Sequence, residues 1–296
     1  MSRQSICVTT PVEDYREQFG LLVKREDLSC PPPGPPFSKT RGVFAHIVAR
    51  PERVIGVLDT YHSQGGWAVA HACRVLGKTC VNYYPRYKAD GNELRPQQTH
   101  SMSLGAHLRP LPAGRSAILY HQAKKELVRE FGPDVYMMPN ALKLPETVSE
   151  TAAELLDNDT VRAVMLSTAI LVPASSATIA AGVVSGLLSL RRDMLAWKGD
   201  VIIHLGYSRS EAEVLRYITQ HVGSDPAALA ENFGIRLDIV NEGYAYKDRA
   251  RPGPDVPWPC NEYYDLKTVR WWLRQREQRT EFATQHEGRA LLWNVG

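Results

Sequence analysis

Lys39 is the residue of this chain whose surroundings most favour chemistry. It lies in the segment 37–42 (FSKTRG), directly after the turn-rich run 30–36 (CPPPGPP). Proline and glycine favour a stiff loop before the lysine, and apolar residues at helical spacing after it predict a helix over 40–49. A lysine held in this way and desolvated has a lowered pKa and can act as a nucleophile or a base. The alternative is a solvated lysine at the start of a helix, and only further site segments elsewhere in the chain can distinguish the two interpretations.

The loop 59–67, with the sequence DTYHSQGGW, is a second candidate. It follows the apolar run 54–58, which is typical of a buried parallel strand, and precedes a helical pattern over 68–76. Backbone N–H groups and the helix dipole favour an anion at such a junction, and the Gln64 amide can add a hydrogen bond. His62 is a candidate acid or base, with a surface or capping histidine as the alternative. A plain glycine-rich turn would have the same pattern.

The segment 173–182, with the sequence PASSATIAAG, is the third candidate. Its small residues let the backbone close around a phosphate, and the hydroxyls of Ser175, Ser176 and Thr178 add donors. The helix that starts at this turn contributes positive potential at its N-terminus. A serine-rich turn is also a common helix N-cap, and backbone angles with φ > 0 are harder to reach without glycine.

Short apolar runs alternate with helical patterns along most of the chain. The expected strands are 21–24, 54–59, 79–84, 105–111, 135–138, 161–172 and 201–205, and the expected helices are 40–49, 68–76, 94–104, 118–131, 146–156, 178–190 and, as the final helix, 266–276. Repeated strand and helix units predict an α/β fold with mainly parallel sheets flanked by helices. Ligands then bind at the carboxyl ends of the strands, where the loop and the serine-rich turn lie.

These segments together resemble a known family. The pair VKREDL (23–28) and SKTRG (38–42) is similar to the N-terminal signature of fold-type II pyridoxal-phosphate (PLP) enzymes, the group of tryptophan synthase β, threonine dehydratase and aminocyclopropane-carboxylate deaminase. The loop around Gln64 resembles the family's substrate-carboxylate loop, with glutamine in place of the usual asparagine. The segment 173–182 resembles its phosphate cup, with serine and alanine in place of most glycines.

The resemblance covers roughly residues 20–190, and 260–267 and 291–296 look more loosely like the family's late active-site loop and last strand. It implies PLP as the cofactor, carried by Lys39 as an internal aldimine, and a homodimer. The implied cofactor-binding residues are Lys39, Ala174, Ser175, Ser176, Ala177, Thr178 and Asn294, the last beside the pyridine nitrogen, and the implied substrate-binding residues are His62, Ser63, Gln64, Gly65 and Tyr264. The two subdomains of the family would be 1–42 with 157–296, which binds PLP, and 43–156.

The implied reaction breaks a bond at Cα of an amino-acid moiety. Elimination or deamination is expected, with decarboxylation as a further choice, and Lys39 serves as the catalytic base. A neutral partner such as Asn294 leaves the ring nitrogen unprotonated, which favours milder chemistry than transamination. A non-catalytic PLP-fold protein is one alternative, suggested by the altered glycines and by Gln64.

A second alternative concerns the substrate, which would be an amino acid already attached to a nucleotide or DNA strand, as in viral base hypermodification. Aromatic and basic residues near strand ends favour it, namely Tyr61, Trp67, Tyr83, Tyr84, Tyr87, Arg86, Lys88, Arg95, Arg249, Arg251 and the run 270–279. A set of core aromatics with solvated charges accounts for the same residues.

Composition limits the remaining classes. With 296 residues and 44% hydrophobic and 23% charged residues, the chain is typical of a globular protein. Its net charge of +3 does not by itself argue for nucleic-acid binding, although it leaves room for a local basic face. Its five scattered cysteines argue against a disulfide framework and a zinc site. No secretory signal is visible at the N-terminus, and a cytoplasmic location is expected. Residues 163–190 carry no charge, but Pro173 divides them, which favours a buried strand and helix over a membrane span.

Overall fold

The structure is a computed structural model that describes residues 6–60, 62–86, 93–192, 196–250 and 255–296. Its internal contacts divide the chain into two units. The first unit is Met1–Val8 with Cys30–Thr147, and the second is Thr9–Ser29 with Val148–Gly296. The subdomain bounds expected from the sequence stay a prediction. The bounds of the two units differ from that expectation. Residues 1–8 and 30–42, expected with 157–296, belong to the first unit, and residues 148–156, expected with 43–147, belong to the second unit.

The first unit is built on a parallel four-stranded sheet in the order β5-β4-β3-β6. Its elements are α2 (Thr40–Val48), β3 (Val54–Leu58), α3 (Gly65–Val75), β4 (Thr79–Arg86), α4 (Pro96–Ser103), β5 (His107–Pro112), α5 (Ser116–Phe131), β6 (Val135–Met137) and the 3-10 turn η3 (Asn140–Leu142). Apolar residues of α2 and α3 form one core with the sheet, and those of α5 form another. The sheet is therefore buried between helices, as the continuous apolar strand β3 at its centre requires.

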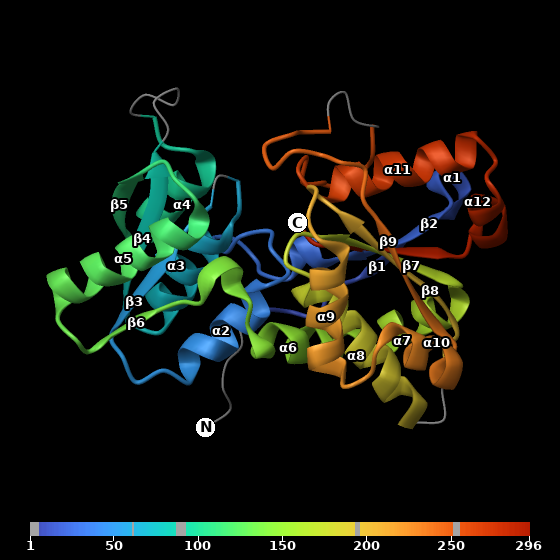
Figure 1. Ribbon diagram of the computed structural model, residues 1–296, viewed down its shortest axis with the longest axis horizontal. Coiled ribbons are helices and arrows are strands. Elements are labelled where there is room, and N and C mark those ends of the chain that lie inside the picture. Colours follow the sequence, from blue (N-terminus) through green and yellow to red (C-terminus); the bar gives the residue numbers. More distant parts are fainter. Residues whose placement is uncertain (1–5, 61, 87–92, 193–195, 251–254) are drawn as a thin grey trace. The chain divides into compact units, whose positions relative to one another are not determined.

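The second unit contains a six-stranded sheet in the order β1-β2-β10-β7-β8-β9, which is parallel except for the pair β1 and β2. Its strands are β1 (Val12–Tyr15), β2 (Leu21–Arg25), β7 (Ala169–Ala174), β8 (Gly199–Leu205), β9 (Ile235–Val240) and β10 (Ala290–Asn294). Its helices are α1 (Arg16–Phe19), the 3-10 turn η1 (Glu26–Leu28), α6 (Pro145–Leu155, which starts in the first unit), α7 (Asn158–Leu166), α8 (Thr178–Arg192), α9 (Glu211–Val222), α10 (Pro226–Phe233), α11 (Asp265–Glu277) and α12 (Glu281–His286). The last strand lies between β2 and β7, so the beginning, middle and end of the chain meet in one sheet (Figure 1).

The α/β architecture with mainly parallel sheets confirms the predicted fold class. Most expected helices and strands are present with small shifts at their ends. The charge-free stretch 163–190 forms the end of α7, the buried strand β7 and most of α8. Within the described ranges, no helix has both the length and the apolar character needed to cross a membrane.

The prediction of a strand over 161–172 was wrong for its first half, which belongs to α7, and was confirmed for 169–172, which lie in β7. The Asp157 carboxylate caps the helix by accepting a hydrogen bond from the Asp159 amide at 3.2 Å. The residues that α7 buries follow helical spacing and are Thr160, Ala163 and Val164. Short apolar runs fit both periods, and here the cap and the burial of one face favour the helix.

The helix expected over 266–276 is present as α11, but it is not the final one, because α12 follows it. The Thr280 hydroxyl starts α12 by accepting a hydrogen bond from the Ala283 amide at 3.2 Å. This N-cap was visible in the sequence as a threonine before a short amphipathic run.

Candidate active site

Lys39 lies in the first unit as the residue before α2, with helical backbone angles of φ −68° and ψ −10°. It is 7% exposed, and its Nζ donates a hydrogen bond to the Ala141 carbonyl at 3.2 Å. Its own carbonyl accepts a hydrogen bond from the Val43 amide at 2.9 Å. The lysine is therefore buried and oriented, in contrast to the solvated alternative.

The segment that receives the Lys39 side chain has an unusual backbone. Ala141 and Leu142 both have positive φ, 59° and 49°, although neither is glycine. Each such residue costs about 1–2 kcal/mol in an L-amino-acid chain, and such conformations persist where the surroundings enforce them. The sequence offers no signal for this turn, because alanine and leucine rarely adopt the left-handed region.

The same segment also contacts the predicted substrate loop. A Cβ atom added at Gly65 would lie 2.9 Å from Leu142 Cδ1, so the leucine packs directly on the start of α3. Ser63 Oγ accepts a hydrogen bond from the Gly65 amide at 3.1 Å. The structure thus connects Lys39 to Ser63 and Gly65 through residues 141 and 142 of the first unit.

Gln64 and His62 occupy the centre of this loop. Gln64 precedes α3, and its Oε1 atom is buried without a hydrogen-bond partner among the described residues. A buried acceptor without a donor is unfavourable unless a ligand supplies one. His62 is buried, which differs from the alternative of a surface histidine.

The Asp59 carboxylate holds this loop through hydrogen bonds to its backbone, a role that the sequence analysis did not identify. Its Oδ1 accepts hydrogen bonds from the amides of Thr60 at 2.9 Å and Gly66 at 3.4 Å, and its Oδ2 lies 3.5 Å from Asn82 Nδ2. A Cβ atom at Gly66 would lie 2.2 Å from Asn82 Nδ2 and 2.7 Å from Asp59 Oδ2, so a larger residue there would displace these two side chains. The available sequence signal was Asn82, a polar residue in the middle of the strand β4.

Burial raises the pKa of Asp59 from 3.8 to about 7, which predicts a pH dependence. The folded protein holds this proton between about pH 4 and 7 while the unfolded chain releases it, so stability from Asp59 is greatest at low pH and is lost as the pH rises through 7. Relative to Asp59→Asn, the wild type should lose about 1.4 kcal/mol of unfolding free energy per pH unit in this window. Urea unfolding at several pH values measures this difference. Parallel pH profiles for the two proteins would contradict it.

The predicted phosphate cup lies in the second unit, between β7 and α8. Ala177 takes the left-handed conformation, with φ 63°, although the sequence has no glycine there. Ser176 Oγ and Thr178 Oγ1 lie 2.9 Å apart and are hydrogen-bonded. A left-handed turn with hydroxyls at the start of a long helix fits a phosphate monoester such as that of PLP.

Two residues from distant parts of the chain adjoin this cup. Tyr264 packs on Gly206, where an added Cβ atom would lie 2.4 Å from Tyr264 Cδ1, and the Gly206 amide donates a hydrogen bond to the Ala174 carbonyl of the cup at 2.9 Å. Burial raises the pKa of the Tyr264 phenol well above the usual value. Arg209 Nη1 donates a hydrogen bond to the Ser175 carbonyl. The structure therefore brings the predicted Tyr264 to the cup and adds Arg209, which the sequence reasoning missed. The sequence signal for Arg209 was its position shortly after β8. Because β7 and β8 are parallel neighbours, the segments that follow them start at the same edge of the sheet.

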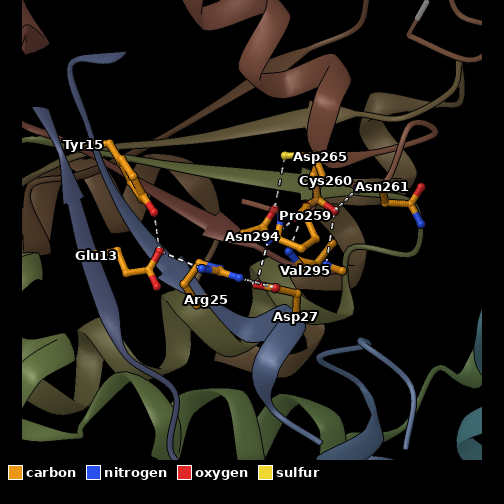
Figure 2. A network of polar contacts seen from close by, with 11 residues as sticks. Glu13, Tyr15, Arg25, Asp27, Pro259, Cys260, Asn261, Asp265, Asn294 and Val295 are labelled. Atoms are coloured by element: carbon orange, nitrogen blue, oxygen red, sulfur yellow. Dashed lines mark hydrogen bonds and ion pairs between the residues drawn. The ribbon is translucent and has the colours of Figure 1, made fainter. Parts of the chain in front are cut away.

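Asn294 is fully buried in a polar network at the end of β10 (Figure 2). Its Nδ2 donates to Asp27 Oδ1 at 2.8 Å and to the Pro259 carbonyl at 3.0 Å. The Cys260 thiol lies 3.7 Å from its Oδ1. The Asn294 amide therefore connects the VKREDL segment to the late loop, and its role beside the pyridine nitrogen stays a prediction.

The VKREDL segment has a structural role in the second unit. Arg25 binds Asp27 through Nε at 2.9 Å and Nη2 at 2.8 Å, and it binds Glu13 through Nη1 at 2.7 Å (Figure 2). Lys24 is fully buried and pairs with Glu154 at 2.6 Å. Buried charges need such partners, which explains why this charged motif lies inside the protein.

Comparisons with known proteins agree with this geometry. No family model matches the sequence. An ACC deaminase homologue of known structure has a TM-score of 0.73 at 19% identity over 99% of this chain and 90% of its own, and maize serine racemase has 0.65 at 14% over 98% and 88%. A curated protein of Pseudomonas phage M6, named glycyl-dTMP PLP-dependent decarboxylase, is 47% identical over 290 residues, which cover 97% of this chain and 98% of that protein. The chain belongs to the fold-type II family of PLP-dependent enzymes.

Family membership confirms several predictions from the sequence. The cofactor is PLP, the protein is an enzyme of the PLP-dependent lyase type, and it acts on an amino-acid moiety. The alternative of a non-catalytic protein is not supported. The assignments of individual site residues stay predictions.

Proposed function

We propose that this enzyme removes CO2 from an amino-acid moiety that is carried on a nucleotide. The observation that carries the proposal is the 47% identity, over nearly the whole of both chains, to the protein named glycyl-dTMP PLP-dependent decarboxylase. The substrate in that name combines an amino acid with a nucleoside monophosphate. In the sequence analysis, decarboxylation was a possible reaction beside elimination and deamination. An amino acid attached to a nucleotide was the alternative substrate there.

The substrate loop supports this proposal. The buried Gln64 Oε1 requires a hydrogen-bond donor, and a nucleobase N–H or the amine of the amino-acid moiety supplies one. The side-chain amide nitrogen of Gln64 and the helix start at Gly65 favour the substrate carboxylate. We assign Ser63, Gln64 and Gly65 to the carboxylate, with His62 and Tyr264 as further substrate contacts.

We assign Lys39 to the covalent attachment of the cofactor and to proton transfer at Cα. The cofactor supplies an electron sink that stabilises negative charge at Cα when a bond there breaks. Loss of CO2 leaves an electron pair at Cα, which takes up a proton from the Lys39 ammonium. Ala174, Ser175, Ser176, Ala177 and Thr178 are assigned to the cofactor phosphate, and Asn294 to the side of the pyridine nitrogen.

The aromatic and basic residues favour a nucleotide over a DNA strand as the substrate. Tyr83 and Tyr84 are buried in the first unit, where no base can stack on them. Trp67 is stacked on His100 with 3.9 Å between ring centroids. Several of the basic residues are paired with carboxylates, namely Arg249 with Glu262, Arg274 with Glu242 and Arg276 with Glu287. Tyr61, Tyr87, Lys88 and Arg251 lie outside the described residues.

The purified enzyme should convert glycyl-dTMP to a product that has lost CO2, while free glycine and dTMP give no turnover. Mass spectrometry of the nucleotide and measurement of released CO2 check this result. Release of ammonia in place of CO2 would support deamination and contradict the proposed reaction. Turnover of free glycine at an equal rate would contradict the nucleotide part.

Binding to a DNA strand is tested separately by retention on immobilised DNA at several salt concentrations. Phosphate contacts make such binding fall steeply with salt. We expect no salt-sensitive retention, and a steep dependence would favour the polymer as the substrate. The homodimer and the cytoplasmic location stay predictions.

A further inference from the structure

Arg209 lies beside the cup in the loop between β8 and α9. Gly206, which starts this loop, donates its amide hydrogen to the Ala174 carbonyl at the end of β7, at 2.9 Å. The parallel register pairs Ala174 with Leu205, so the two strands end side by side. Ser210 then caps α9 by accepting a hydrogen bond from the Glu213 amide at 3.3 Å. Arg209 is thus placed between two well-defined backbone positions.

The hydrogen bonds of Arg209 are incomplete. Nη1 donates to the Ser175 carbonyl, while Nε is buried and has no partner among the described residues. No carboxylate in the described part of the chain forms an ion pair with this guanidinium. Other arginines do have such partners, namely Arg25, Arg109, Arg236, Arg249 and Arg274. A buried guanidinium N–H without an acceptor is unfavourable, and an anion that accepts its hydrogen bond removes this cost.

We infer that Arg209 is a ligand of the PLP phosphate at this cup. This inference rests on the proposed assignment of Ala174–Thr178 to that phosphate. The guanidinium contacts the cup backbone itself, at Ser175, and it brings the positive charge that a dianionic phosphate requires. Arg209 therefore compensates for a cup in which Ser and Ala stand in place of flexible glycines.

The test compares binding of PLP and of pyridoxal, which lacks the phosphate, to full-length protein stripped of its cofactor. Absorbance titration gives both affinities for the wild type, Arg209→Gln, Arg209→Lys and the control Arg216→Gln, which changes an exposed arginine of α9. We expect Arg209→Gln to weaken PLP about 10- to 100-fold, as for the loss of a charged hydrogen bond, and to leave pyridoxal unchanged. The PLP affinity of Arg209→Lys should lie between those of the wild type and Arg209→Gln, because lysine keeps the positive charge but lacks the planar guanidinium.

Each other outcome has a definite meaning. An equal loss for PLP and pyridoxal would show that Arg209 only shapes the cup and would overturn the inference. Unchanged PLP affinity with weaker dTMP binding to the holoenzyme would assign Arg209 to the substrate phosphate instead, and also overturn it. If Arg209→Gln does not fold, Arg209→Lys and a phosphorus NMR spectrum of the bound cofactor decide. A wild-type protein that binds no PLP would defeat the cup assignment itself.

Discussion

Lys39→Ala is expected to abolish turnover and the covalent attachment of the cofactor. The side chain supplies both the amine that holds PLP and the proton at Cα, and alanine supplies neither. A loss of more than about 10³-fold in kcat follows from the removal of both roles. The measurement is borohydride reduction of the holoenzyme followed by peptide mapping, with activity assayed in parallel. Wild-type protein should carry the reduced cofactor on Lys39, and the variant should carry none.

Two controls separate chemistry from folding in this experiment. Lys39→Arg keeps a positive charge near the Ala141 carbonyl but cannot form the bond to the cofactor, so it should be as inactive as the alanine variant. Lys125→Ala changes an exposed lysine on α5 of the same unit and should have wild-type activity. Full turnover by Lys39→Ala, or reduced cofactor on another lysine, would show that the assignment is wrong.

Gly42→Ala is expected to destabilise the protein and to weaken the bond between Lys39 and the cofactor. A Cβ atom at Gly42 would lie 2.3 Å from Thr147 Cα and 2.4 Å from Thr147 N, and backbone atoms cannot yield as a flexible side chain can. The helix α2 must shift, and Lys39 at its start shifts with it. Overpacking of this kind costs about 1–3 kcal/mol, more than the gain of about 1 kcal/mol from the better helix propensity of alanine.

Urea unfolding and the absorbance of the holoenzyme measure the two effects of Gly42→Ala. Gly114→Ala is the matched control, because its Cβ atom would lie 3.5 Å from Leu119 Cδ2, an ordinary contact. This control should have wild-type stability and cofactor content. An increase in the stability of Gly42→Ala would contradict the close packing of α2 on Thr147.

The sequence by itself determined the fold class and the order of the site segments. Strand and helix periods are local properties, so the alternation that predicts an α/β fold is readable without any contact. The position of Lys39 between a proline-rich loop and α2 is local as well. Local pattern was ambiguous at 161–172, where apolar residues fit both a helix and a strand and the cap at Asp157 decided for α7.

Only the tertiary structure decided which distant residues surround these segments. Arg209 reaches Ser175 because β7 and β8 pair in parallel, and Asn294 reaches Asp27 because β10 lies beside β2. The left-handed turns at Ala141, Leu142 and Ala177 are likewise imposed by packing, since none of these residue types favours that backbone region. Such contacts depend on strand order and register, which join parts of the chain that no local pattern relates.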